Sequence, residues 1–334
     1  MHDQPTDLDR AALRDQLQRG WSIDAVSLEY LPVGFGSHHW LAAGADGSRW
    51  FVTATDLRRG HNAAHRPDLA FARLDGALRA AAVLRDEGGL EFVLAPVRAS
   101  DGSVVRRTGA HYAIRVEPFV DGTSARDGDF DDPGQRREMA TLVGRLHAAS
   151  AAVADAGPGR DDFALADREA LEGALGDLNR AWNYGPFGEP TRRLLRGQAG
   201  AVGERLRGYD RLSEHLRATQ AGWVLTHGEP HNANLLRAES GRLWLVDWDT
   251  ALIAPPERDL WMVLDADLAG WDEYRAAGGA DSLDLNALAL YRERWALAEI
   301  CEYVAGFRRP HHDSDDTREA WRELRGYLPD LPSG

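Results

Sequence analysis

The sequence of 334 residues contains no lysine, because all 39 of its basic residues are arginine. Any mechanism that requires a lysine side chain is therefore excluded. Cys301 is the only cysteine, which excludes an intrachain disulfide and a cysteine-ligated metal cluster. We expect Cys301 to be a small buried apolar residue.

Long apolar segments are also missing. The first ten residues are polar and acidic, and no stretch reaches the roughly 18 apolar residues of a membrane span. We therefore expect a cytoplasmic protein without a membrane partner. The net charge of −14 argues against a nucleic-acid partner and favours a cationic or neutral one.

The first third of the chain has the pattern of a β-sheet. Short segments rich in aromatic and β-branched residues alternate with glycine-containing breakers, which predicts strands at 28–33, 38–42, 48–55 and 112–116. Between them, apolar residues recur at helical spacing over 69–84. We expect a five-stranded sheet and one helix in residues 1–120.

The pattern changes after residues 117–122, where a turn and a polar run are followed by long helical periodicity. Helices are expected at 136–151, 171–178, 192–206 and 288–307, and short strands at 224–226, 234–237 and 242–246. The chain is thus predicted to be an α+β protein of two lobes, a strand-rich lobe over 1–120 and a mostly helical lobe over 121–334.

The segment 223–247 has the groups that phosphoryl transfer requires. Glu229 provides a carboxylate, Asn234 provides an amide five residues later, and Asp247 ends a predicted hairpin. Phosphoryl transfer needs a group that orients the attacking hydroxyl and oxygen ligands for the magnesium that bridges the phosphates. Because the hairpin brings its strand ends together, Asn234 and Asp247 can share one cation.

Other interpretations of these residues remain open. His227 and His231 flank Glu229 with a spacing that resembles a zinc site, but Pro230 breaks the helix that such a pair would need. A turn containing Gly34 and Gly36 is, by itself, an ordinary connection between strands.

Taken together, these motifs resemble the aminoglycoside phosphotransferase family, which is related to the protein kinases, and in it the spectinomycin-phosphotransferase-like branch. The family pattern is His-Gly-Asp-x-x-x-x-Asn, then a strand that ends Asp-Trp or Asp-Phe, then Asp-Leu. The residues that match are His227, Gly228, Glu229, Asn234, Asp247, Trp248, Asp259 and Leu260. The resemblance implies a bilobal kinase-like fold, with a catalytic loop at 227–234.

By the same resemblance, Glu229 is the catalytic base, although the family usually has aspartate there. Asn234 and Asp247 take the magnesium positions, while His227 and Asp259 brace the catalytic loop. The nucleotide is expected to lie between the loop residues Gly34, Phe35, Gly36, Ser37 and His38 and a hinge at 117–122 that includes Glu117, Phe119 and Val120.

The family places a phosphate-binding lysine on the third strand, and Thr53 occupies that position here. A hydroxyl cannot replace the lysine charge, so we expect Arg58, Arg59, His38 or His39 to bind the phosphates. The helix glutamate that pairs with the lysine is also not evident in 69–84.

The substrate side is expected to contain carboxylates for a cationic acceptor. Candidate contacts are Asp249, Asp265, Asp267, Glu299, Glu302, Trp182 and Tyr184. The alternatives are that the acids form a solvated face, that Asp249 is a second metal ligand, and that the aromatic residues belong to the core.

The predicted function is transfer of a phosphoryl group from ATP or GTP, with Mg²⁺, to a small hydroxylated acceptor that is cationic or polar, such as an aminocyclitol antibiotic. The alternative is a pseudokinase that binds a nucleotide or another ligand without transferring the phosphoryl group. Retention of Glu229, Asn234 and Asp247 favours the enzyme.

Overall fold

The N-terminal part of the chain is built around an antiparallel sheet. The computed structural model describes all residues except 35, 59–65, 126–129, 131, 219–221 and 329–334. The strands lie in the order β1-β2-β3-β5-β4. Their bounds are β1 Ala25–Leu31, β2 Ser37–Gly44, β3 Arg49–Asp56, β4 Arg106–Thr108 and β5 Tyr112–Pro118.

The strand register aligns residues from three neighbouring strands across the sheet. Thr53 of β3 lies opposite His39 of β2 on one side and opposite Arg115 of β5 on the other. Because directly opposed residues of antiparallel strands point to the same face, these three side chains form one row. Along β5 the same face carries Glu117, two residues beyond Arg115.

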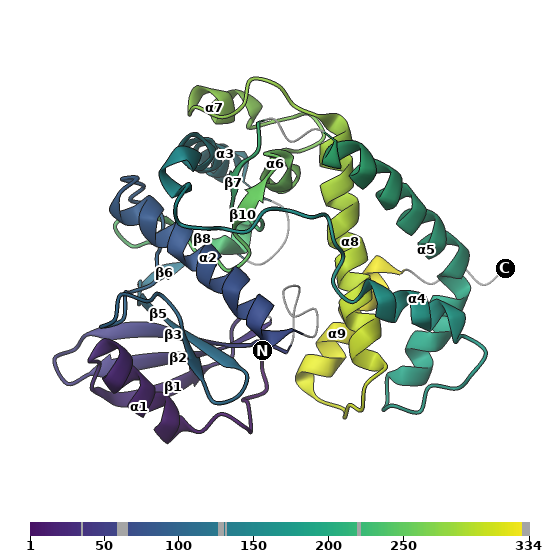
Figure 1. Cartoon of the computed structure of the whole chain (residues 1–334), viewed down its shortest axis with the longest axis horizontal. Helices are drawn as coiled ribbons and strands as arrows, with labels where there is room; N and C mark the ends of the chain where they lie inside the picture. Colours follow the sequence, from purple (N-terminus) through teal and green to yellow (C-terminus); the bar gives the residue numbers. More distant parts are fainter. Residues whose placement is uncertain (35, 59–65, 126–129, 131, 219–221, 329–334) are drawn as a thin grey trace.

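Two helices accompany the sheet (Figure 1). Helix α1 (Arg10–Trp21) begins at Asp9, whose side chain accepts a hydrogen bond from the Ala11 N–H, a standard N-cap. Helix α2 (Pro67–Asp86) begins with proline at its first turn, where the missing N–H has no helical partner to lose.

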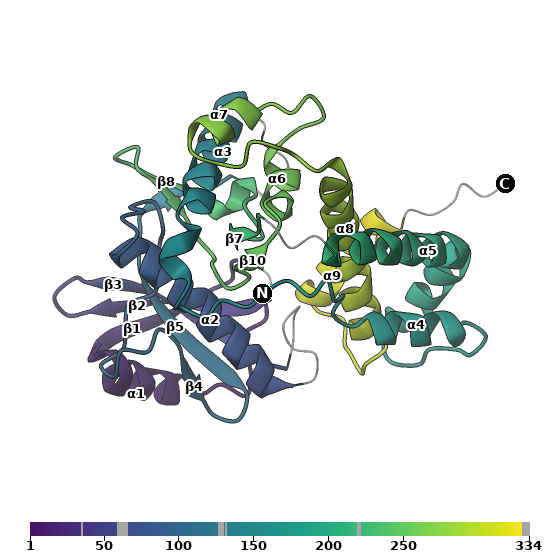
Figure 2. The ribbon, with the colours of Figure 1, turned by 45° about the horizontal axis from the view of Figure 1, so that its top comes forward.

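The C-terminal part is mostly helical. Its helices are α3 Pro133–Ala148, α4 Arg168–Gly176, α5 Gly188–Arg217, α6 Glu257–Val263, α7 Trp271–Ala276, α8 Leu285–Phe307 and α9 Asp315–Tyr327, with 3₁₀ turns at Ser150–Val153 and Asn232–Asn234. Asp284 caps α8, and Ser314 with Thr317 forms a capping box at α9. In Figure 2, α4, α5, α8 and α9 group on the side away from the sheet.

Two small sheets carry the segments that approach the cleft. Strand β6 (Gly122–Thr123) pairs with β8 (Leu235–Ala238), which forms a hairpin with β9 (Leu243–Leu245). Strand β7 (Val224–Thr226) pairs with β10 (Leu252–Ala254). The catalytic loop expected at 227–234 therefore runs from the end of β7 to the start of β8.

Three hydrophobic clusters support this architecture. One joins α1 to the sheet and includes Leu13 and Trp40. A second joins α2, α3 and the small sheets and includes Leu146 and Trp248. The third packs α4, α5 and α8 together and includes Trp182, so each face of the cleft has its own buried support.

The expected fold class is confirmed, with a five-stranded antiparallel sheet before a helical part. Cys301 is fully buried, as expected, and burial raises the pKa of its thiol to about 12. The sequence interpretation missed α1, α6, α7, α9, β4, β6 and β10. Among the described residues, no helix has the length and apolarity needed to cross a membrane.

Candidate active site

A cavity of about 1440 Å³ separates the sheet from the helical part. On the sheet side it is lined by the loop after β1 and by the end of β5, and on the helical side by α8 and α9. His2 also lines it and contacts Asp316 and Glu319 of α9. Between them it is lined by the loops around β8 and β9. Lining residues include Gly34, Gly36, Ser37, Arg115, Glu117, Phe119, Val120, Glu229, Asn234, Asp247, Asp249, Trp295, Glu299 and Glu302.

The loop at 227–234, which is expected to be catalytic, is held by the buried carboxylate of Asp259 on α6. One oxygen, Oδ2, accepts a hydrogen bond from the His227 N–H at 2.8 Å, and the other accepts one from the Gly228 N–H at 2.6 Å. His147 of α3 contacts Oδ2 through Nε2 at 3.0 Å. Burial alone would raise the pKa of Asp259, but the hydrogen bond and charge from His147, together with charges that include that of Arg258, lower the pKa overall.

The His227 ring is neutral and connects the loop to the strand that precedes Asp247. Its Nε2 lies 2.8 Å from the Val246 carbonyl and donates to it, while Nδ1 accepts from the Glu229 N–H at 3.2 Å. A ring that donates at one nitrogen and accepts at the other carries a single proton. Burial lowers the pKa of His227 to about 4, which agrees with that tautomer.

Glu229 lies in the cavity at the centre of the site. Burial, followed by the negative charges of Asp247 and Asp249, raises its pKa well above the usual value of a glutamate. A carboxylate with a raised pKa is a stronger base than an exposed one, which suits it to take a proton from a hydroxyl near neutral pH.

Asn234 and Asp247 fit a hard cation. Asn234 Nδ2 donates to the Glu229 carbonyl at 2.9 Å, which leaves Oδ1 to act as a ligand. Its main-chain carbonyl accepts from the Val246 N–H, so Asn234 lies beside the start of the Asp247 loop. Asp247 adopts a left-handed φ of 64°, a conformation uncommon for residues other than glycine, and its side chain remains 42% exposed. An amide and a carboxylate oxygen are ligands that Mg²⁺ accepts.

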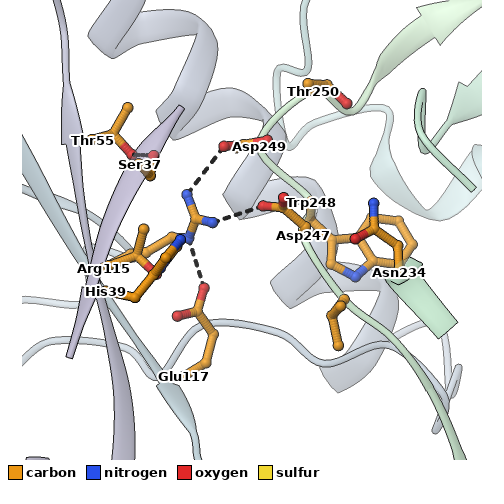
Figure 3. Close-up of polar contacts among 12 residues, drawn as sticks. Ser37, His39, Thr55, Arg115, Glu117, Asn234, Asp247, Trp248, Asp249 and Thr250 are labelled. Carbon is orange, nitrogen blue, oxygen red and sulfur yellow. Dashed lines mark hydrogen bonds and ion pairs between the residues drawn. The ribbon is translucent and has the colours of Figure 1, made fainter. Parts of the chain in front are cut away.

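Across the cavity, the buried Arg115 side chain bridges both walls (Figure 3). Its NH2 lies 2.8 Å from Asp247 Oδ1, its NH1 lies 3.3 Å from Asp249 Oδ2, and its Nε donates to Glu117 Oε1 at 2.8 Å. The sequence interpretation missed this arginine. Alternating charges at Arg115 and Glu117 in an otherwise apolar strand were the available signal.

Glu117 has an unusual environment for a carboxylate. It is buried, and its Oε2 atom has no hydrogen-bond partner in the described part of the chain. Burial raises its pKa to about 7, although the Arg115 charge opposes that shift. Residues of the segment expected to be the hinge do line the cavity, and the Glu117 side chain points to Arg115.

The expected phosphate contacts are largely elsewhere. Arg58 is bound to Asp56 at 2.8 Å and also contacts Asp7, and it is not among the described residues that line the cavity, so the structure gives no support to its assignment as a phosphate ligand. His38 contacts the Tyr30 hydroxyl. Arg59 and Phe35 lie outside the described residues.

Two further residues of the expected nucleotide site lie in the row across the sheet. Thr53 is fully buried and its hydroxyl lies 3.2 Å from His39 Nδ1. Burial lowers the pKa of His39 to about 3, so this ring is neutral at neutral pH. Neither residue therefore supplies the positive charge of the absent lysine.

The other end of the cavity is acidic and aromatic. Helix α8 lines it with Arg292, Trp295, Glu299, Glu302 and Tyr303, and α9 adds Glu319, Glu323 and Tyr327. Spacings of three, four and seven residues place the α8 set on one helix face. The Trp295 Nε1 donates to the Tyr327 hydroxyl at 2.9 Å, which links the two helices.

Of the expected substrate contacts, Asp249, Asp265, Glu299 and Glu302 line the cavity. Trp182, Tyr184 and Asp267 are not among the described lining residues. Trp182 is buried in the helical core, where Arg308 stacks on its ring, so its assignment to the substrate is wrong. Tyr184 and Asp267 are exposed, and Asp267 directly follows Asp265 and Ala266, which line the cavity.

The zinc interpretation gains no support from His227 and His231, because both ring nitrogens of His227 are occupied by main-chain hydrogen bonds. In the described residues, three histidine, aspartate or glutamate ligands converge only at His2, Asp316 and Glu319, outside the catalytic loop.

Comparison with known proteins gives consistent results. The model of the phosphotransferase enzyme family (APH) matches residues 40–298. Protein StrN of Streptomyces griseus is 30% identical over 312 residues, which cover 91% of this chain and 86% of StrN.

Solved structures show the same fold at low identity. Spectinomycin phosphotransferase APH(9)-Ia, in complex with ADP and spectinomycin, superposes with a TM-score of 0.73 at 15% identity and covers 96% of this chain and 95% of that one. Amicoumacin kinase hAmiN has a TM-score of 0.62 at 16% identity, with 96% and 93% covered. The expected protein-kinase-like fold is thereby confirmed.

Proposed function

We propose that this chain, which belongs to the phosphotransferase enzyme family, transfers the γ-phosphoryl group of ATP to a hydroxyl of a small cationic acceptor with Mg²⁺. Membership of the family makes the chain a kinase-type phosphotransferase for small molecules. The nucleotide, the ion and the acceptor class are our proposal. The observation that carries it is that Glu229, Asn234 and Asp247 line one cavity between the glycine loop and the acidic face of α8.

Glu229 orients the acceptor hydroxyl and takes its proton. In a loose phosphoryl-transfer transition state, proton removal is late, so positioning matters more than base strength. The raised pKa of Glu229 favours proton acceptance once the carboxylate is ionised. His227 and Asp259 keep the loop that carries Glu229 in place through the main-chain hydrogen bonds described above.

Asn234 and Asp247 hold the metal ion. When bound, Mg²⁺ supplies charge neutralisation and orientation for the phosphates. The Asp247 Oδ1 atom accepts from Arg115, so Oδ2 remains as the second oxygen of that carboxylate. In this proposal Asp247 binds the ion through Oδ2 and Arg115 of the opposite wall through Oδ1.

In this proposal, residues 1–120 form the nucleotide-binding lobe and residues 121–334 carry the catalytic groups and the acceptor site. The nucleotide lies between Gly34, Gly36 and Ser37 and the hinge residues Phe119 and Val120. ADP and AMP-PNP occur in the named complexes of APH(9)-Ia and hAmiN, which supports an adenine nucleotide as donor.

The acceptor binds at the α8 and α9 end of the cavity. Carboxylates at Glu299, Glu302 and Glu319, together with Trp295 and Tyr303, suit an amine attached to a hydroxylated ring or chain. Spectinomycin is named in the complex of the structural neighbour, so an aminocyclitol is the first acceptor class to examine.

The test is transfer of label from γ-labelled ATP, and separately from GTP, to a panel of hydroxylated amines and to matched acceptors without the amine. We expect labelled product with the amines, and loss of transfer by at least about 100-fold in Asp247→Asn, because the ion loses a charged ligand. Asp155→Asn is the matched control, since Asp155 is exposed and is not among the described residues that line the cavity, so it should leave transfer unchanged. Binding of Mg-ATP without transfer to any acceptor would instead support a pseudokinase.

A further inference from the structure

Because the chain contains no lysine, another positively charged side chain must contact the nucleotide phosphates. In the described lining of the cavity, the arginines are Arg115 and Arg292. Arg292 lies on α8, on the helical side of the cavity and one turn before Trp295. Arg115 lies on β5 next to the strand where the lysine was expected.

The register explains how an arginine on β5 can reach the position of a lysine on β3. Arg115 lies directly opposite Thr53, and their side chains share the face that also carries His39. Directly opposed Cβ atoms in an antiparallel pair are only about 5 Å apart. A long side chain that starts one strand away can therefore place its charge in the same part of the cleft.

The contacts of Arg115 show where that charge lies. Its NH2 and NH1 groups contact Asp247 and Asp249, which belong to the metal side of the cavity. A guanidinium has five N–H groups, and three are used by Asp247, Asp249 and Glu117 in the described residues. One N–H on NH1 and one on NH2 therefore remain as donors for phosphate oxygens.

Glu117 fixes this arginine from behind. Glu117 lies two residues after Arg115 on the same strand, and its Oε1 accepts a hydrogen bond from Arg115 Nε. Its Oε2 is buried without a hydrogen-bond partner in the described chain. The arrangement corresponds to the ion pair between lysine and a helix glutamate in the related enzymes, but both partners come from β5. An isolated structural salt bridge would not need to extend to two carboxylates on the opposite wall.

We propose that Arg115, held by Glu117, binds the phosphate oxygens of the nucleoside triphosphate in place of the lysine that β3 lacks. The proposal rests on the nucleotide-dependent function above. It makes Arg115 a nucleotide contact and Glu117 a positioning residue, and it replaces the sequence-based assignment of Arg58.

The first experiment compares binding of Mg-ATP and of adenosine by calorimetry in the wild type and in Arg115→Gln. We expect the variant to lose about 10- to 100-fold in affinity for Mg-ATP, the range for charge-assisted hydrogen bonds, and to bind adenosine as the wild type does. Arg58→Gln is the matched control, because Arg58 is bound to Asp56 outside the cavity, and it should bind both ligands normally.

The second experiment moves the charge back to the family position. Thr53→Lys in the Arg115→Gln background places an ammonium opposite the vacated position, and we expect it to recover at least about tenfold in Mg-ATP affinity. This double variant keeps the charge balance of the cleft, so it also tests the proposal if Arg115→Gln alone does not fold. A purely structural Arg115 would not give recovery that is specific for ATP over adenosine.

The proposal is overturned if Arg115→Gln keeps the wild-type preference for Mg-ATP over adenosine, or if the folded double variant shows no preference. These outcomes do not depend on whether the chain transfers a phosphoryl group to an acceptor. A wild type that prefers Mg-ATP but transfers to no acceptor would contradict the reaction, while loss of that preference in Arg115→Gln would still support the phosphate contact.

Discussion

The two walls of the cleft hold their functional groups in different ways. On the loop wall, Glu229 and Asn234 lie on one short segment that Asp259 holds through main-chain hydrogen bonds. On the sheet wall, no such loop positions the charge. Arg115 and Glu117 are placed by the register of β5 against β3.

This difference matters for how function is inferred from sequence. A loop that must present several main-chain and side-chain groups at once requires a fixed spacing, so its pattern can be recognised. A charge on a sheet can come from either of two neighbouring strands, since opposed residues share a face. A missing lysine on one strand therefore does not establish that the charge is missing.

Of the substitutions that distinguish the two walls, Glu229→Gln is expected to have the largest effect on activity. The amide has the same shape but cannot accept the proton, so kcat should fall by roughly 10²- to 10⁴-fold. Binding of Mg-ATP should remain as in the wild type, in contrast to Arg115→Gln on the other wall. Steady-state kinetics with direct nucleotide binding checks both parts, and a large loss of Mg-ATP affinity in Glu229→Gln would contradict the division of roles.

A second substitution, Asp259→Asn, examines the support of the loop wall. Asp259 is fully buried and accepts from His227, Gly228 and His147. An amide would turn an NH₂ group toward these donors, so the free energy of unfolding should fall by roughly 3 to 5 kcal/mol. The residual folded protein should also have a reduced kcat, because the loop loses its anchor.

The matched control for that substitution is Asp161→Asn. Asp161 is buried beside Tyr291 and Arg294 in the helical part. It should lose stability to a similar extent while the folded fraction keeps its kcat. Equal losses of kcat in both variants, measured at a temperature where both are folded, would show that Asp259 has no particular role in the loop.

The smallest expected effect concerns pH, because each wall contains one buried neutral histidine. Burial lowers the pKa of His39 on the sheet to about 3 and of His227 on the loop to about 4. An unfolded histidine titrates near 6.5, so below that pH the unfolded state binds a proton that the folded state refuses. Each histidine should thus cost up to roughly 1.4 kcal/mol of stability per pH unit as the pH falls from about 6.5 to 5.

Glu117 acts in the opposite direction over the same range, since burial raises its pKa to about 7 and the folded state then binds the additional proton. The quantity to measure is therefore the difference in the free energy of unfolding between each histidine variant and the wild type. Relative to the wild type, His39→Gln and His227→Gln should gain stability as the pH is lowered from 7 to 5 in urea unfolding. A constant difference across that range would contradict the neutral state of the replaced ring.

Much of the fold was predictable because the elements had clear periodicity. The expected strand at 224–226 agrees with β7, and the expected helix at 288–307 lies within α8. Helix α9 was missed although Trp321, Leu324 and Tyr327 recur at helical spacing and pack against the helical core. Helix α6 was missed because seven residues are too few to show a period.

The substrate side was less predictable. The sequence indicated Glu299 and Glu302, which do line the cavity, but it also indicated Trp182, which packs in the helical core. The sequence around a tryptophan does not tell whether its ring faces the cavity or packs in the core. Only the packing of α4, α5 and α8 determines which aromatic residues face the cavity and which are buried.

By itself, the sequence determined the α+β fold, the spacing of Glu229, Asn234 and Asp247 in one segment, and the absence of a lysine. These features depend on local periodicity, on spacing within one segment and on composition. Only the tertiary structure decided that Arg115 of β5 reaches Asp247 and Asp249 across the cleft. The physical reason is that strand register, which joins distant segments through main-chain hydrogen bonds, sets which side chains share a face.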